Sequence, residues 1–344
     1  MAGSEENSMN KFFLSLLIIV VSACGERNIG GPVLSQKLTD NHTMCFGRNL
    51  IDLPSDFVWV DGLTAVFSPQ GLMGVDGEVN VEVVKAAVSK ETFTNLILNR
   101  RNEIVKSATN TTGKLRNQRS VDENSKIFTI LTIDDAYSTE LHALLDGNYI
   151  VLKTASYENQ FMAAEQRVID MWRNFEKTTA ANMATGYCLG NVLVREEFKQ
   201  EQADFSFRSA KNPDVKISIE TNTYRPDEKK SLLERVDGAS PLARALEIKP
   251  KVIRKGELKI ASMNAQEWLG WIILGEDDKA KKQYGFALET MRAKPSRSQP
   301  HIHLELDTGQ PSADGAVAET NLTETEIIGL WDSLSRSIRA SVNQ

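Results

Sequence analysis

The sequence predicts an α+β fold of two similar domains, each a mainly antiparallel sheet with packed helices and a closing amphipathic helix. Many runs alternate apolar and polar residues with the period of a strand, and fewer runs have helical periodicity. Short motifs also recur in the same order in both halves of the 344-residue chain. This length suits two domains of about 150 residues each. We expect an N-terminal domain at residues 41–180 and a C-terminal domain at residues 184–340.

The repeat is indicated by matching motifs at the beginning and end of each half. CFGRNLI, which begins at Cys45, and CLGNVLV, which begins at Cys188, share a cysteine, an apolar residue, a glycine and two later aliphatic residues. At the far ends, residues 164–175 (AEQRVIDMWRNF) align without gaps on residues 323–334 (TETEIIGLWDSL). Apolar residues recur at helical spacing in both segments, so each half is expected to close with an amphipathic helix.

Between these ends the patterns are mainly those of strands. Strand-like runs occupy residues 125–133, 148–156, 215–224 and 301–307, and residues 251–262 resemble a hairpin that pivots on Gly256. Helical runs lie at residues 90–107 and 229–245, the second interrupted by glycine and proline. Residues 107–125 are polar with few apolar positions, which predicts a mobile loop.

Composition excludes some classes of partner. Hydrophobic residues make up 41% of the chain and charged residues 25%, with a net charge of −6. These values are typical of a globular protein. No lysine- and arginine-rich segment is dense enough for a nucleic-acid site. An acidic chain without a basic face also argues against adsorption to anionic lipid.

The first residues predict export. Lys11 precedes a hydrophobic run at residues 12–21, which is too short to span a bilayer as a helix but suits a signal peptide. The run ends in Val-Ser-Ala-Cys at Cys24, which resembles a bacterial lipobox. We interpret residues 1–24 as a lipoprotein signal peptide with Cys24 as the lipidated residue. The alternatives are a buried strand with a chance cysteine and an uncleaved anchor.

Two further expectations concern this segment. Acidic residues before the positively charged region are unusual in signal peptides, so Met9 is the expected true start.

Residues 25–40 would form a tether. Gly25, by resemblance to Gram-negative lipoproteins, favours the inner leaflet of the outer membrane, with the body in the periplasm. That compartment is oxidising.

A catalytic site is not expected. The chain contains no G-x-S-x-G, P-loop, G-x-G-x-x-G or H-E-x-x-H motif. One tempting pattern is HIHLELD, in which His301, His303, Glu305 and Asp307 alternate and would share one face of a strand. Two imidazoles and two carboxylates could hold a divalent ion. The alternative is the solvated face of an antiparallel strand. We expect no metal and no cofactor, and keep a site at His301, His303 and Glu305 as the alternative.

Cys45 and Cys188 allow three interpretations. A nucleophilic cysteine needs a nearby base, and no histidine lies near Cys188 in the sequence. A disulfide between the two would join the halves at equivalent strands, and an oxidising compartment permits it. Both could also be buried packing residues. The last two interpretations stay open.

Several segments together resemble one family. They are TMCFGRNLIDLP (residues 43–54), TGYCLGNVLV (185–194), SLLERV (231–236), KGELKIASMNAQEWL (255–269), PHIHLELDTGQ (300–310) and LWDSLSRSIR (330–339). In this order they resemble the class-four cognate immunity proteins of type VI secretion lipase effectors, which pair an N-terminal and a C-terminal domain. The resemblance extends from residue 43 to residue 339, and residues 72–125 depart from it most.

The resemblance implies an inhibitor and not an enzyme. Such a protein binds a phospholipase effector in the periplasm and blocks access to its active site, and it contacts the membrane only through its lipid anchor. No residue of the chain can be assigned as an effector contact. The alternatives are a metal-binding or enzymatic periplasmic lipoprotein and an envelope scaffold lipoprotein.

Overall fold

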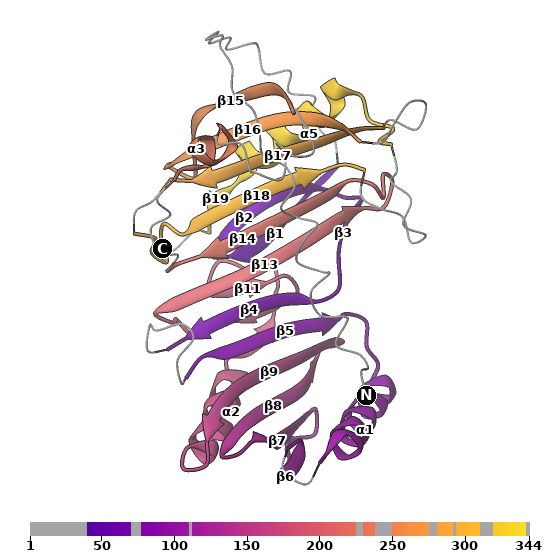
Figure 1. Cartoon of the computed structure of the whole chain (residues 1–344), viewed down its shortest axis with the longest axis vertical. Helices are drawn as coiled ribbons and strands as arrows, with labels where there is room; N and C mark the ends of the chain where they lie inside the picture. The colour runs from indigo at the N-terminus through magenta and orange to yellow at the C-terminus, as the bar shows by residue number, and fades with distance from the viewer. Residues whose placement is uncertain are drawn as a thin grey trace, which may run out of the picture.

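The computed structural model describes residues 40–69, 77–109, 112–224, 230–237, 250–274, 281–291, 294–309 and 319–341 (Figure 1). The predicted signal peptide, Cys24 and nearly all of the predicted tether lie outside these residues. None of the helices within the described ranges is long and apolar enough to cross a membrane.

The chain alternates short runs of strands with single helices. The first half contains β1 (Asn41–Gly47), β2 (Asn49–Pro54), β3 (Phe57–Trp59), β4 (Leu63–Ser68), β5 (Val79–Lys85), α1 (Lys90–Ser107), β6 (Lys114–Asp122), β7 (Ser125–Ile133), β8 (Ala136–Leu145), β9 (Asn148–Tyr157), α2 (Phe161–Trp172) and β10 (Phe175–Lys177). The second half contains β11 (Tyr187–Leu189), β12 (Val192–Val194), β13 (Gln200–Ser209), β14 (Lys216–Asn222), α3 (Leu232–Asp237), β15 (Lys251–Ile260), β16 (Met263–Leu274), β17 (Lys281–Thr290), β18 (His301–Asp307), α5 (Glu324–Ser337) and β19 (Arg339–Ala340).

The described strands form two antiparallel sheets, which confirms the predicted α+β class. The large sheet has 13 strands in the order β15-β16-β17-β18-β14-β13-β4-β5-β9-β8-β7-β6, and β3 pairs with β13 beside this path. The small sheet has six strands in the order β10-β12-β11-β1-β2-β19. Each sheet contains strands from both halves, which pair at β4–β13 and β3–β13 in the large sheet and at β1–β11, β10–β12 and β2–β19 in the small sheet.

The same strand order occurs in the two halves of the large sheet. Outward from the β4–β13 pair, one half runs β4-β5-β9-β8-β7-β6 and the other runs β13-β14-β18-β17-β16-β15. Along the chain, each half forms these elements in the same sequence: a strand hairpin, one helix and then four further strands. The halves therefore match in topology while sharing both of their sheets.

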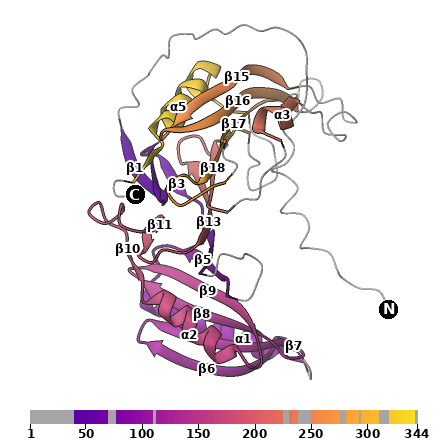
Figure 2. The same ribbon diagram turned by 90° about the vertical axis from the view of Figure 1, so that its left-hand side faces the viewer.

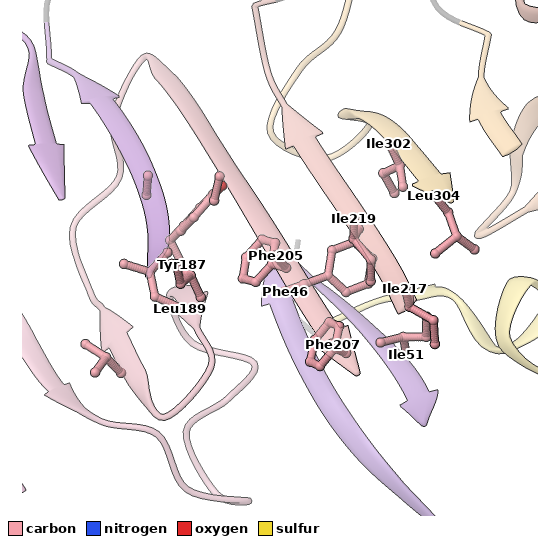
Figure 3. Packing of buried hydrophobic residues seen from close by; sticks show 14 of the residues in the cluster. Phe46, Ile51, Tyr187, Leu189, Phe205, Phe207, Ile217, Ile219, Ile302 and Leu304 are labelled. Carbon is pink, nitrogen blue, oxygen red and sulfur yellow. The ribbon is translucent and has the colours of Figure 1, made fainter. Parts of the chain in front are cut away.

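The main core lies between the two sheets. Strands β13 and β14 send every second residue into it, including Phe205, Phe207 and Ile217, which are at most 1% exposed. The small sheet contributes Phe46, whose ring meets that of Phe205 edge to face at 6.1 Å (Figure 3). Helices α2 and α5 pack into this same core through residues such as Val168 and Trp331. Side chains from both halves thus form one continuous hydrophobic core.

Helices α1 and α3 pack on the opposite face of the large sheet. Phe93, Ile97 and Ile104 of α1 cluster with residues of β7 and β9, and α3 packs Leu232 and Val236 against Trp268 of β16. In Figure 1 these two helices lie at opposite ends of the sheet, and Figure 2 shows the small sheet and α5 on the other side. The large sheet therefore carries the small sheet, α2 and α5 on one face and α1 and α3 on the other.

The predicted helix at residues 90–107 is confirmed as α1. Ser89 caps it, because its side chain accepts a hydrogen bond from the Thr92 amide at 3.1 Å. Of the predicted helix at 229–245, α3 forms the part at Leu232–Asp237, and residues 238–249 lie outside the described ranges.

Two predictions about strands are wrong. The polar segment 107–125 contains β6, which pairs only with β7 within the described sheet. An edge strand with one exposed side needs few apolar residues. The segment therefore lacks the apolar alternation from which a strand is predicted. The predicted hairpin does not pivot on Gly256, because β15 continues through this residue. Its chain reverses at Ala261 and Ser262, which both have positive φ.

Candidate interaction face

The middle of the large sheet is uncovered by described elements on the face that bears α1 and α3. The helices pack toward the two ends, where α1 contacts β6 and β8 and clusters with Val84 of β5, and α3 contacts β16 (Figure 1). An antiparallel sheet commonly has one solvated face, so exposure alone does not indicate a site. The charges on this face are more informative.

The register of the strands determines which side chains lie on this face. On β13, Ala203, Phe205 and Phe207 are buried in the core, so the residues between them point to the opposite face. Cross-strand pairing then aligns one residue from each of five neighbouring strands. The row is Glu82, Thr64, Asp204, Glu220 and His303, on β5, β4, β13, β14 and β18 in that order. We call these five residues, together with Glu305 on the same face of β18, the acidic strip.

Two carboxylates of the strip are directly opposed. Asp204 pairs with Glu220 across β13 and β14, and like charges in this position destabilise a sheet. Within the described part of the chain, no ion pair involves Glu82, Asp204 or Glu220. Loss of surrounding water and the charge of Glu220 raise the pKa of Asp204 to about 6. The sheet thus places two carboxylates opposite each other, with the imidazole of His303 as the cross-strand neighbour of Glu220.

The residues considered as metal ligands lie on β18, at one end of the strip. His301 lies against Glu289, with 2.5 Å between Nε2 and Oε1, and His303 lies against Glu305, with 2.9 Å between the same atom types. Each imidazole therefore has its own carboxylate partner. The described residues contain no group of three histidine, cysteine or acidic side chains that could hold a metal ion.

The pKa values at this end follow from those pairs. Burial alone would raise the pKa of Glu289, but the hydrogen bond with His301 and nearby positive charges lower it to about 2. Burial opposes protonation of His303, yet the carboxylate of Glu305 raises its pKa above the ordinary value. For Asp307, loss of water and then the charge of Glu305 raise the pKa to about 7, although Lys216 lies opposite.

Cys45 and Cys188 lie in the small sheet, which packs on the face of the large sheet opposite to the strip. They are at most 3% exposed and pack with Leu50 and Leu193. The structure links their sulfur atoms across β1 and β11, with the two Cα atoms 5.8 Å apart. The glycines that follow them by two residues, Gly47 and Gly190, have φ of +54° and +68° at the ends of these strands. A Cβ atom on Gly190 would lie 2.5 Å from the ring of Trp59, so close packing also requires glycine there.

Sequence reasoning did not find the acidic strip. Its residues are ordinary polar positions of alternating strands, and only the pairing of β4 with β13 brings the two halves of the strip together. That pairing joins residues about 140 positions apart, and no local pattern encodes it.

The fold is that of immunity proteins of type VI secretion. It matches the crystal structure of the Tle4–Tli4 complex with a TM-score of 0.65 and 19% identity, over 89% of this chain and 99% of that chain. It also matches the apo structure of the immunity protein TplEi of the type VI secretion system from Pseudomonas aeruginosa, with a TM-score of 0.63 and 20% identity, over 90% of this chain and 99% of that chain. The structure of TplEi complexed with "L" peptide gives a TM-score of 0.60 and 20% identity, over 88% and 99%.

The sequence comparison is more specific for the second half. Residues 182–343 match the family described as the Tle cognate immunity protein 4 C-terminal domain. The resemblance expected from the sequence is thereby confirmed. The family and the similar structures are immunity proteins and not enzymes, in agreement with the absence of catalytic motifs from the sequence. Curated protein sequences give no match.

Proposed function

We propose that the chain is an immunity protein that binds a type VI secretion phospholipase effector and inhibits it by blocking access to its active site. The observation that carries this proposal is the family match of residues 182–343. The fold supports it over both halves, because the similar structures include an immunity protein in complex with its Tle effector. Binding without turnover is consistent with a chain that lacks catalytic motifs.

The architecture suits a rigid binder. One core contains residues of both halves, and strands of the two halves pair at β4–β13, β3–β13, β1–β11, β10–β12 and β2–β19. A preorganised surface loses little conformational freedom on binding, which favours affinity. The large sheet also presents an extended face, as needed for a stable protein–protein interface of about 800 Å² per partner.

We further propose that the protein acts in the periplasm and is anchored by lipid at Cys24 to the inner leaflet of the outer membrane. The support is the sequence alone: a hydrophobic run of signal-peptide length, a lipobox-like end and glycine after the cysteine. The substitution Cys24→Ser should move the protein from the membrane fraction to the soluble fraction. Unchanged fractionation would contradict lipidation.

We infer that the halves are diverged copies of one domain, at residues 41–180 and 184–340. The support is their common strand order and the matching position of Cys45 and Cys188, which the structure brings together. A disulfide between equivalent residues would then form at the β1–β11 pair, where the two copies meet in the small sheet. We propose that this disulfide forms in the oxidising periplasm.

The proposed function is tested by protection. A G-x-S-x-G hydrolase encoded by an adjacent gene would be the candidate effector, and it is directed to the periplasm of a sensitive host with and without the chain. We expect growth arrest without the chain and growth with it. A catalytically inactive lipase controls for toxicity of expression. Equal killing with and without the chain would overturn the proposal.

A further inference from the structure

We propose that the acidic strip is the docking surface for a basic segment of the effector, which lays lysine or arginine side chains across the junction of β4 and β13. This inference rests on the function proposed above. It adds the face of the molecule that makes contact and the charge of the partner segment. The dominant contacts would therefore come from both halves of the chain.

The size of the strip fits such a segment. Strands in a sheet are about 4.8 Å apart, so the row from β5 to β18 spans roughly 19 Å. That is the length of about six extended residues or of a helix of about 13 residues. Helices α1 and α3 stand on the same face at the two ends of the sheet and leave this width uncovered by described elements (Figure 1).

The charge of the strip determines the chemistry of the partner. It contains four carboxylates, from Glu82, Asp204, Glu220 and Glu305, and one imidazole. The nearest cations on β13 and β14 are Arg208 and Lys216, two side-chain positions along each strand, or about 13 Å away. A cationic segment would relieve the repulsion between opposed carboxylates, and complementary charge would also speed the encounter.

A second observation indicates an absent hydrogen-bonding partner. The Nδ1 atom of His303 is buried, and within the described structure it has no hydrogen-bond partner. Its other ring nitrogen is bound to Glu305. Buried polar atoms in native proteins are usually satisfied, so this ring lacks one hydrogen-bond partner among the described residues.

The same charges argue against two other occupants. A second copy of the chain docked by two-fold symmetry would place one acidic strip against another, and like charges would oppose association. An anionic membrane surface would be repelled for the same reason. A basic protein segment is the occupant that the charges favour.

The test compares two charge-matched double variants in the full-length mature chain. Asp204→Asn/Glu220→Gln removes the opposed pair, and Asp135→Asn/Glu123→Gln removes two exposed acids from the turns between β6 and β7 and between β7 and β8. The exposed ion pair of Glu123 with Lys90 contributes little to stability. Binding of the purified lipase is followed by surface plasmon resonance at low and high NaCl concentration, and folding of each variant is verified by circular dichroism.

We expect the strip variant to lower the association rate by about tenfold or more at low salt and to lose most of its salt dependence. The control variant should stay within about twofold of the wild-type protein. Failure of the wild-type chain to protect cells or to bind would overturn the proposed function and this inference together. Protection by the wild-type chain with equal rates and salt dependence for both variants would overturn this inference alone.

Discussion

Asp204 and Glu140 affect the stability of the folded protein in opposite ways. Asp204 lies opposite another carboxylate, and its pKa is raised to about 6 by loss of water and by Glu220. Glu140 has the reverse environment, since Arg100 at 2.8 Å and His142 at 3.0 Å bind it. Although burial opposes it, these partners lower the pKa of Glu140 to about 2. The first carboxylate costs stability when charged, and the second contributes to it.

These environments predict that Asp204→Asn stabilises the protein at neutral pH. The folded chain retains a proton on Asp204 at pH values where the unfolded chain has lost it. Stability due to this group therefore falls as pH rises from about 4 to about 6. Although the Asp204 carboxylate loses part of its water shell, the residue is still exposed, so screening should limit the gain from substitution to no more than about 1 kcal/mol. Urea unfolding at pH 4, 6 and 8 should give a gain that disappears at pH 4.

The matched comparison is Glu140→Gln in the same sheet. This substitution should destabilise the protein by roughly 1–3 kcal/mol at neutral pH, because it weakens a buried charge-assisted network. The contribution of Glu140 is present above about pH 4.5 and is lost as pH falls toward 2. A destabilising Asp204→Asn, or a neutral Glu140→Gln, would contradict these assignments.

The two buried cysteines predict a redox-dependent stability. Their bond would close a loop with a sequence separation of 143 residues, and loss of such a bond typically costs about 2–5 kcal/mol. Reductant should therefore lower the guanidinium midpoint of the wild-type protein and leave that of Cys45→Ser/Cys188→Ser unchanged. Mass spectrometry after alkylation without reductant should detect no label on either cysteine. Complete labelling in the unfolded, unreduced protein would show that the bond is absent.

At the scale of elements, the two closing helices are alike in position and different in construction. Helix α5 begins with a capping box in which Thr323 and Glu326 bind each other's backbone amides, whereas α2 has no side-chain cap. Trp331 of α5 is fully buried, and its indole nitrogen donates to Glu267 at 3.2 Å. Trp172 of α2 is partly exposed, and its indole nitrogen donates to Asp122.

This difference predicts unequal effects of equivalent substitutions. Trp331→Ala should cost about 3–5 kcal/mol, because it leaves a large cavity and removes a partner of a buried carboxylate. Trp172→Ala should cost less, at about 1–2 kcal/mol, because its ring already contacts solvent. Chemical unfolding of the two variants gives both values. Equal losses would mean that the helices contribute equally to the core.

The helices and strands also show which elements can be predicted from sequence periodicity and which cannot. Helix α1 and strands β14 and β18 follow from periodicity, because each buries one regular face. The β6 strand could not be predicted, because an exposed edge imposes no apolar alternation. The reversal after β15 was misplaced because its turn uses alanine and serine with positive φ, while Gly256 sits within the strand. Turn chemistry is a weaker guide when the turn lacks glycine.

The whole molecule differs from two independent domains in one respect that sequence motifs did not reveal. The repeated motifs indicated matching halves, but both sheets continue across the boundary between them. Long-range pairing of β4 with β13 and of β1 with β11 depends on tertiary packing, which no local signal specifies. For this reason the cysteine pair was open at the level of sequence, and the acidic strip was not predicted.

This sharing of sheets predicts that neither half is a stable monomer alone. A chain of residues 184–340 would expose β11 and one side of β13 as unpaired edges, together with core residues such as Phe205 and Phe207. We expect it to aggregate or to dimerise through these strands. Size-exclusion chromatography with light scattering measures its mass. A soluble monomer with cooperative unfolding would show that the second half folds independently.

Inhibition of the lipase by the purified chain tests the central claim most directly. Effector activity on phospholipid vesicles is measured while the mature chain is added in increasing amounts, with Asp204→Asn/Glu220→Gln in parallel. Our account predicts that activity falls to background near a fixed molar ratio, and that the double variant requires a higher concentration. Full lipase activity at a large excess of correctly folded wild-type chain would contradict the account.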